Sequence, residues 1–273
     1  MTSFRCNGIV YDREGPRGEM PVLLIHAGVA DRRMWDPIWQ VLVRERDVVR
    51  LDLRGFGDSA ERPAGPGSLA GDVLAVLAHA GIDRCHLVGA SLGAGVAVEV
   101  ALTSPSAVAS LFLAAPAGSL LDDITPDLRA FLDAEDAALD CGDLDAAVEA
   151  NLAWWIEGPR RSAGQVDPAA RALVARMQRR AFEVTADWDD VEMGELEPPV
   201  LDRLSEIAAP VLVLVLVLVG GFDLDTVHTA ADRVVAKTAR ARRVDWPDVG
   251  HLPALERPAD FLDMLREWIT QPS

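Results

Sequence analysis

The sequence predicts an α/β protein with a mostly parallel central sheet of about eight strands, helices on both faces of that sheet, and an inserted helical segment. Short apolar runs alternate with helix-length segments through residues 1–116 and again through 204–273, a pattern typical of a parallel sheet covered by helices. Residues 117–203 contain helix-like segments and no convincing strand. The 273 residues (29.4 kDa), half of them apolar, suffice for one large core domain with an insertion.

The first two strands are predicted to form a hairpin, because Asn7 and Gly8 separate the short stretches 4–6 and 9–11. Asn-Gly is the dipeptide that tight hairpin turns prefer. The later strands are continuous apolar runs, as expected where helices bury both faces of a parallel sheet. They are expected at Val22–Ile25, Val48–Leu51, 85–88, Val108–Ala114, 211–219 and 240–246.

Helices are predicted in the segments between these strands. Ser68 can cap a helix that runs to residue 80, and Gly81 can end it. The helices of the core are expected at 35–46, 68–80, 92–102, 226–237 and 259–269, and those of the insertion at 126–138, 144–156 and 168–184.

The strand predicted at 211–219 is unusual, because it alternates Val and Leu throughout. Four of its residues could be a Leu-Val duplication. An insertion of even length keeps each side chain on its face of the sheet. It also lengthens the strand by about 13 Å, at roughly 3.3 Å per residue. A bulge and an early start of the strand both remain open.

The charge of the chain excludes some classes of partner. Acidic residues outnumber basic ones by 43 to 26, which gives a net charge of −17 and a pI near 4.6. Nucleic acids and anionic membrane surfaces both require a basic face, so neither is expected as a partner. The insertion 117–203 alone holds 20 acidic and 8 basic residues.

The sequence also predicts a cytoplasmic, soluble protein. The first residues are broken by charge and offer no apolar core for a signal peptide. The longest apolar run has nine residues, whereas a membrane span needs about 20. The three cysteines are scattered without CxxC spacing, so neither a disulfide framework nor a zinc site is expected. A monomer and a homodimer both remain open.

Residues 89–93 (Gly-Ala-Ser-Leu-Gly) match the pattern G-x-S-x-G between a predicted strand and a helix of small residues. A sharp turn from strand to helix holds such a serine in a strained conformation, with its hydroxyl above the carboxyl edge of the sheet. The amide of Leu92 then points at the reacting centre from a helix N-terminus, where it can stabilise a developing oxyanion. Ser91 is therefore the candidate nucleophile.

Four further motifs follow in a consistent order along the chain. They are 26–28 (His-Ala-Gly), 52–59 (Asp-Leu-Arg-Gly-Phe-Gly-Asp-Ser), 220–223 (Gly-Gly-Phe-Asp), and 249–251 (Val-Gly-His) with 256–258 (Glu-Arg-Pro). Together with residues 89–93, they resemble the α/β-hydrolase family, including its order of serine, then acid, then histidine. The resemblance covers nearly the whole chain and agrees with the predicted sheet.

The resemblance implies a serine hydrolase that acts on a small carboxylic ester or lactone. Ser91 would attack the substrate, His251 would accept its proton, and an aspartate would orient the imidazole. The backbone amides of Leu92 and Gly28 would hold the oxyanion, with Val29 a less favoured donor. No metal or organic cofactor is implied. A C–C bond hydrolase, an acyltransferase, a perhydrolase and a non-catalytic ligand receptor on this fold are the alternatives.

Two aspartates compete for the role of the triad acid. Asp223 has the spacing from Gly220 that the family motif requires, whereas Asp225 can instead cap the helix 226–237. A third location, after the strand Val108–Ala114, offers no carboxylate. Asp223 is therefore the predicted acid.

Other residues of these motifs are expected to have structural roles. His26 is expected to order the oxyanion loop. Arg54 is expected to pair with Asp52 or Asp58, and Glu256 to start a helix.

The insertion is expected to form a helical cap over Ser91, with its acidic residues on the outer surface because unpaired buried charge is costly. Some of Trp154, Trp155 and Trp188 are expected to face the substrate, and the others to pack the cap helices together. Substrates should then be small, apolar and neutral near the scissile bond.

Overall fold

The computed structural model describes residues 3–122, 124–161, 164–208 and 214–270. Its eight-stranded sheet has the order β1-β2-β4-β3-β5-β6-β7-β8, with antiparallel pairing of β2 to β1 and β4 and parallel pairing elsewhere. The predicted fold class is therefore confirmed. The strands are β1 (Ser3–Cys6), β2 (Ile9–Glu14), β3 (Val22–Ile25), β4 (Val48–Leu51), β5 (Cys85–Ala90), β6 (Val108–Ala114), β7 (Leu214–Gly220) and β8 (Ala241–Trp246).

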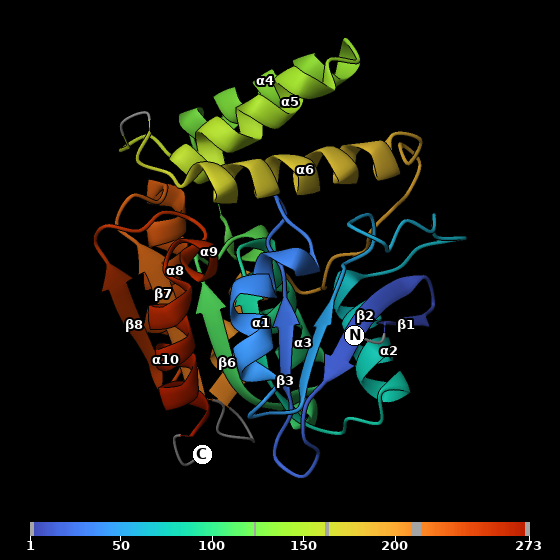
Figure 1. Ribbon diagram of the computed structural model, residues 1–273, viewed down its shortest axis with the longest axis vertical. Coiled ribbons are helices and arrows are strands. Elements are labelled where there is room, and N and C mark those ends of the chain that lie inside the picture. Colours follow the sequence, from blue (N-terminus) through green and yellow to red (C-terminus); the bar gives the residue numbers. More distant parts are fainter. Residues whose placement is uncertain (1–2, 123, 162–163, 209–213, 271–273) are drawn as a thin grey trace.

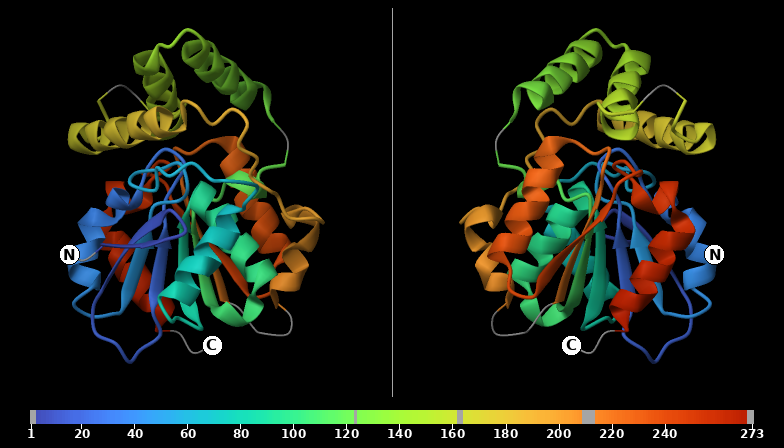
Figure 2. Two further views of the ribbon diagram at one scale, coloured as in Figure 1. Left: turned by 90° about the vertical axis from the view of Figure 1, so that its right-hand side faces the viewer. Right: turned by 90° about the vertical axis from the view of Figure 1, so that its left-hand side faces the viewer.

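Helices cover both faces of this sheet (Figure 2). One face is packed by α2 (Leu69–His79), α3 (Leu92–Thr103) and α8 (Asp225–Lys237). The other is packed by α1 (Asp36–Leu42) and α10 (Pro258–Ile269). The shorter helices are η1 (Arg32–Trp35), η2 (Pro105–Ala107), η3 (Gly118–Leu120), α7 (Val200–Arg203), η5 (Leu204–Ala208) and α9 (Pro253–Glu256).

The helices of the insertion stack above one edge of the sheet (Figure 1). We call α4 (Pro126–Asp140), α5 (Leu144–Asn151), η4 (Leu152–Glu157) and α6 (Pro168–Thr185) the cap helices. They lie over the carboxyl ends of the parallel strands, where ligands bind in open α/β sheets. Their apolar residues, among them Leu152 and Met177, continue the core of the α1 and α10 face.

The ends of the insertion behave differently from its middle. Both η3 and α7 pack against α3, a helix of the core. Gly67 forms an isolated bridge with Met193, which holds the segment after α6 against the core as well. The cap helices therefore make up only the middle part of residues 117–203.

Two predicted helices differ from the observed ones. The helix expected at 35–46 begins at Asp36, with Pro37 in its first turn, and ends at Leu42 because the bond from Arg44 N–H to the Val41 carbonyl (3.1 Å) tightens the chain into a turn. The helix expected at 144–156 is α-helical only to Asn151. It continues as the π-helix η4, which ends with a bond from Gly158 N–H to the Ala153 carbonyl, five residues back.

The predicted hairpin lies at one edge of the sheet, and the Val-Leu strand lies near the other edge. Asn7 (φ 50°) and Gly8 (φ 82°) form the turn between β1 and β2, as predicted. Residues 211–213 of the Val-Leu strand lie outside the described residues. From Leu214 to Gly220, β7 runs in continuous register between β6 and β8, so Gly220 pairs with Trp246 at the carboxyl edge.

Candidate active site

Ser91 occupies the turn between β5 and α3, in the strained conformation that the sequence predicts. Its φ of 52° and ψ of −117° lie where L-residues are seldom found. Glycine is required on either side: a Cβ at Gly89 would lie 2.2 Å from the Gly93 carbonyl oxygen, and a Cβ at Gly93 would lie 2.4 Å from that of Ile25. This close packing of α3 against β3 fixes the serine at the edge of the sheet.

Two side chains from the neighbouring loops form a hydrogen-bonded chain with Ser91. His251 follows β8, and its Nε2 lies 2.7 Å from Ser91 Oγ. Its Nδ1 lies 2.8 Å from Oδ1 and 3.0 Å from Oδ2 of Asp223, which follows β7. All three residues are buried, so their contacts are shielded from bulk water. Three loops that are far apart in sequence thus bring these side chains into one continuous chain of hydrogen bonds.

The competing aspartate lies elsewhere. Asp225 is the first residue of α8, and its exposed carboxylate pairs with Arg160. The expectation that Asp225 caps this helix is wrong: the N-cap residue is Leu224, which makes no side-chain cap bond. Asp223 faces inward because its Oδ1 also accepts a bond from Leu224 N–H (2.8 Å), which fixes the carboxylate toward His251.

The two predicted oxyanion donors lie side by side. A Cβ at Gly28 would lie 3.5 Å from the Leu92 side chain, and both residues line the same cavity as Ser91. Val29 lines it too. Within the described part of the chain, neither the Gly28 nor the Leu92 N–H has an acceptor. Two unpaired amides beside a nucleophilic hydroxyl can together bind one oxygen anion.

His26 orders the loop that carries Gly28. Its Nε2 accepts a bond from Leu53 N–H (2.9 Å), so its Nδ1 is the nitrogen that donates to the Ala27 carbonyl (2.8 Å). Full burial lowers the pKa of His26, which keeps this imidazole neutral. The ring thus ties the oxyanion loop to the loop after β4, and it is not part of the hydrogen-bonded chain of Ser91.

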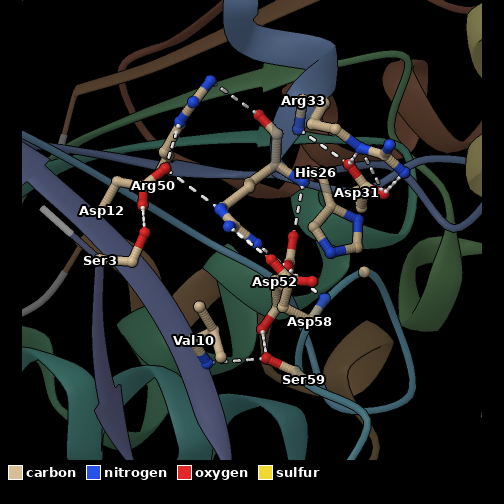
Figure 3. A network of polar contacts seen from close by, with 12 residues as sticks. Ser3, Val10, Asp12, His26, Asp31, Arg33, Arg50, Asp52, Asp58 and Ser59 are labelled. Carbon is tan, nitrogen blue, oxygen red and sulfur yellow. Dashed lines mark hydrogen bonds and ion pairs between the residues drawn. The ribbon is translucent and has the colours of Figure 1, made fainter. Parts of the chain in front are cut away.

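A largely buried polar network surrounds Asp52 next to this loop (Figure 3). Asp52 accepts bonds from the backbone N–H of Arg32 and of Asp58, each at 2.8 Å, and pairs with the Arg32 guanidinium. The expectation that Arg54 pairs with Asp52 or Asp58 is wrong, because Arg54 extends to Asp72 on α2. Arg32, from η1, takes both of those carboxylates instead.

A cavity of about 560 Å³ lies between the core and the cap helices, with Ser91 in its wall. Its lining is mostly apolar, with side chains from both parts of the chain, such as Val29, Phe131, Trp155 and Phe182. No lysine or arginine occurs among the lining residues that the structure describes. The cavity therefore suits a small neutral molecule better than an anion.

Of the three tryptophans considered for this pocket, only Trp155 is among the described lining residues. Its ring centroid lies 4.8 Å from that of His251. Trp154 stacks on Phe131 at 5.9 Å and is not among the described lining residues, and Trp188 packs over Gly55. Phe131 of α4 also contacts Trp155, at 5.7 Å, so both tryptophans pack against α4 and Trp155 is the one that reaches the cavity.

Two adjacent arginines tie the cap to the loops that carry Asp223 and His251. Arg160 donates to the Asp223 backbone carbonyl (3.2 Å). The buried Arg161 pairs with Glu256, whose carboxylate accepts a bond from Gly250 N–H at 3.0 Å. Glu256 was expected to start a helix, but it is the last residue of α9 and holds the histidine loop. The sequence did not predict a role for either arginine, because their partners are far away in the sequence.

The remaining histidines lie apart from this site and have structural partners. His79 (α2) bonds to the Tyr11 hydroxyl, His86 (β5) to the Ser110 hydroxyl, and His228 (α8) contacts the Arg243 guanidinium. In the described ranges, no group of three His, Cys, Asp or Glu residues is arranged to hold a metal ion. Those ranges also contain no helix that is both long and apolar enough to cross a membrane.

Comparisons with known proteins point to one family. A model described as the alpha/beta hydrolase family matches residues 22–264. RutD of Variovorax paradoxus, a protein described as a carbamate hydrolase, is 33% identical over 203 residues, which cover 70% of this chain and 75% of that protein. A second relative is the dihydrolipoyllysine-residue acetyltransferase component of the acetoin cleaving system of Pseudomonas putida. It is 40% identical over 106 residues, which cover 38% of this chain. That match spans only 29% of the acetyltransferase component.

The fold also matches solved structures over its whole length. The enol-lactonase from Burkholderia xenovorans LB400 superposes with a TM-score of 0.76, covering 99% of this chain and 100% of that one, at 20% sequence identity. At this identity the likeness concerns the fold.

Proposed function

Because the chain belongs to the alpha/beta hydrolase family, we propose that it is a serine hydrolase that cleaves a small carboxylic ester or lactone through an acyl-enzyme. The observation that carries the proposal is the buried chain of hydrogen bonds from Ser91 through His251 to Asp223. In this chain each residue has the partner that its proposed role needs.

The first half of the reaction forms the acyl-enzyme. Ser91 Oγ attacks the carbonyl carbon, and its proton passes to Nε2 of His251 while the carbonyl oxygen becomes an anion. The N–H groups of Gly28 and Leu92 stabilise that anion. The C–O bond to the alcohol then breaks, and the alcohol takes the proton from His251. With a lactone, that alcohol stays attached to the acyl chain.

Water completes the cycle by the same steps. His251 accepts a proton from water, the resulting hydroxide attacks the acyl carbon, and Ser91 leaves with the proton. Asp223 keeps the imidazole in the orientation and tautomer that accept a proton at Nε2, and it stabilises the imidazolium. This chemistry uses side chains and backbone of the protein alone. We propose that residues 117–203 act as a cap over it, with Trp155 in the pocket wall.

The names of the relatives support this class of reaction. The carbamate hydrolase and the enol-lactonase are both named for cleavage at a carbonyl carbon. The match to the acetyltransferase component covers too little of that protein to carry its activity over.

Covalent labelling of Ser91 tests the proposal. After treatment with a fluorophosphonate, intact-mass spectrometry should show one adduct, and peptide mapping should place it on Ser91. The Ser91→Ala protein should gain no adduct and should lose turnover of short-chain p-nitrophenyl esters and simple lactones. Turnover that survives Ser91→Ala would refute the assignment. Ligand binding without turnover in either protein would favour a receptor instead.

A further inference from the structure

The inner surface of the cap carries three polar residues in an otherwise apolar cavity. Glu135 of α4, Asn151 of α5 and Gln178 of α6 line the same cavity as Ser91, one from each helix. The acidic residues described in 117–203 are exposed except for Glu157, which pairs with Arg171, and Glu135. Glu135 is therefore the acidic residue of the cap that faces the substrate cavity.

These polar groups are only partly satisfied by one another. Asn151 Nδ2 donates to Glu135 Oε1 and to the Ala147 carbonyl (3.0 Å). Gln178 is 5% exposed, and its Oε1 has no hydrogen-bond partner among the described residues. A buried acceptor without a partner is destabilising, so a native structure seldom keeps one without a use.

The electrostatics of Glu135 point in the same direction. Burial raises the pKa of Glu135, and Asp136 adds to this, whereas the hydrogen bond from Asn151 opposes it. The hydrogen bond from Asn151 therefore does not fully offset the cost of burying this carboxylate. Packing alone does not account for the three side chains, because apolar residues would fill the same space at no desolvation cost.

We propose that Glu135, Asn151 and Gln178 form a subsite for a neutral hydrogen-bond donor, an amide N–H or a hydroxyl, on the acyl chain of the substrate. The proposal rests on the serine hydrolase function. An acyl group attached to Ser91 would occupy this cavity, so the acyl chain is the part of the substrate that the cap contacts. Glu135 and Gln178 supply acceptors, and the amide of Gln178 can turn to present its oxygen.

The charge of the cavity narrows the substrate class. An anionic chain would meet Glu135 with no lysine or arginine among the described lining residues. A cationic chain would lose its hydration against the apolar walls. A neutral ester or lactone that bears an amide or hydroxyl group satisfies both conditions.

Three p-nitrophenyl esters of matched chain length test the subsite. The N-acetyl-β-alanine ester carries an amide N–H, the 5-oxohexanoate ester replaces that N–H by a methylene, and the hexanoate ester lacks both polar groups. In the wild type we expect kcat/KM for the amide to exceed that for the ketone by at least tenfold, because a site built for a donor rejects the analogue without it. A ratio below threefold would overturn the proposal.

Variants of the subsite residues test whether these residues cause the preference for the amide ester. Glu135→Gln and Gln178→Met should each lower the amide-to-ketone ratio at least threefold. Asp136→Asn is the matched control, since it removes the same charge from the exposed neighbour of Glu135 and should keep the wild-type ratio. Equal ratios in Glu135→Gln, Gln178→Met and the control would also refute the subsite. Melting temperatures check folding, and Glu135→Leu replaces Glu135→Gln if the latter unfolds.

The failure of the catalytic proposal can be told apart from that of the subsite. If Ser91→Ala retains ester turnover, the serine mechanism is wrong. Ethyl ethers of the three corresponding alcohols, which cannot be hydrolysed, are then titrated into the Ser91→Ala protein by calorimetry. Tighter binding of the amide than of the ketone would still support the subsite, and equal binding would reject it.

Discussion

Replacing Asp223 with asparagine removes one charge and changes almost nothing in shape. The carboxylate Oδ1 accepts bonds from Leu224 N–H and from Nδ1 of His251, and Oδ2 lies 3.0 Å from the same Nδ1. The amide oxygen of an asparagine would stay where Leu224 N–H points, which turns its NH₂ group toward His251. An NH₂ group opposite Nδ1 favours the imidazole that carries its proton on Nε2, and this form cannot accept the proton of Ser91.

The size of the effect follows from that change of tautomer. Loss of the orienting carboxylate lowers kcat by about 10⁴ in serine proteases. At 1.36 kcal/mol for each factor of ten, this corresponds to about 5.4 kcal/mol of transition-state stabilisation. We expect the same order of loss for Asp223→Asn. KM should change little, because Asp223 is not among the residues that line the cavity.

The assay is hydrolysis of p-nitrophenyl butyrate by two matched variants, Asp223→Asn and Asp225→Asn. Asp225 lies two residues further along, and its exposed carboxylate pairs with Arg160, so its variant should keep kcat within threefold. Thermal unfolding of both variants shows whether they retain the fold. If Asp223→Asn keeps more than a tenth of the wild-type kcat, or if the two variants rank in reverse, the reasoning fails.

Three further predictions concern the pocket, the elbow and the core. Trp155→Ala should raise KM more than it lowers kcat, since the residue forms a wall of the cavity, whereas Trp154→Ala should leave KM within twofold; equal kinetics in both would mean that Trp155 only packs the cap. Gly93→Ala should abolish soluble folding or activity, because its Cβ would lie 2.4 Å from a backbone oxygen of β3. Circular dichroism and the esterase assay check this, and a variant that is both folded and active would contradict it. Burial lowers the pKa of His86 to about 4 from 6.5, so as the pH falls the unfolded chain takes up a proton on His86 before the folded protein does. Protonation of His86 therefore lowers the free energy of unfolding between pH 6.5 and 4, and His86→Gln should reduce that loss by about 3 kcal/mol. Urea titrations at both pH values measure that difference, and equal pH dependence in the two proteins would contradict it.

The sequence was sufficient to predict features that short-range geometry dictates. The elbow around Ser91 requires glycines at fixed spacing, and the turn after β7 brings Asp223 rather than Asp225 to His251. The register of the Val-Leu strand could not be predicted from the sequence, because Val and Leu alternate throughout it. It depends on pairing with β6 and β8, which sets the position of Gly220.

Other features depend on contacts between distant segments. Arg32 and Arg54 each lie within two residues of an aspartate in the sequence, and only the packing of η1 and α2 decides which carboxylates each arginine reaches. The directions of Trp154 and Trp155 depend on the change from α5 to a π-helix, for which the sequence gives no clear signal.

The arginine ties at one end of the cap have a consequence for how substrate enters. Arg161 and its bond to Glu256 are largely buried, whereas the pair between Arg62 and Asp190 beyond the far end of α6 is exposed. Exposed pairs contribute about 0–1 kcal/mol, and segments held by few buried contacts open most readily. The bridge between Gly67 and Met193 attaches the chain to the core again beyond Asp190, so we expect movement of the cap to be confined to the helices between Arg161 and that bridge. The loops that carry Asp223 and His251 would then stay in place while substrate enters and product leaves.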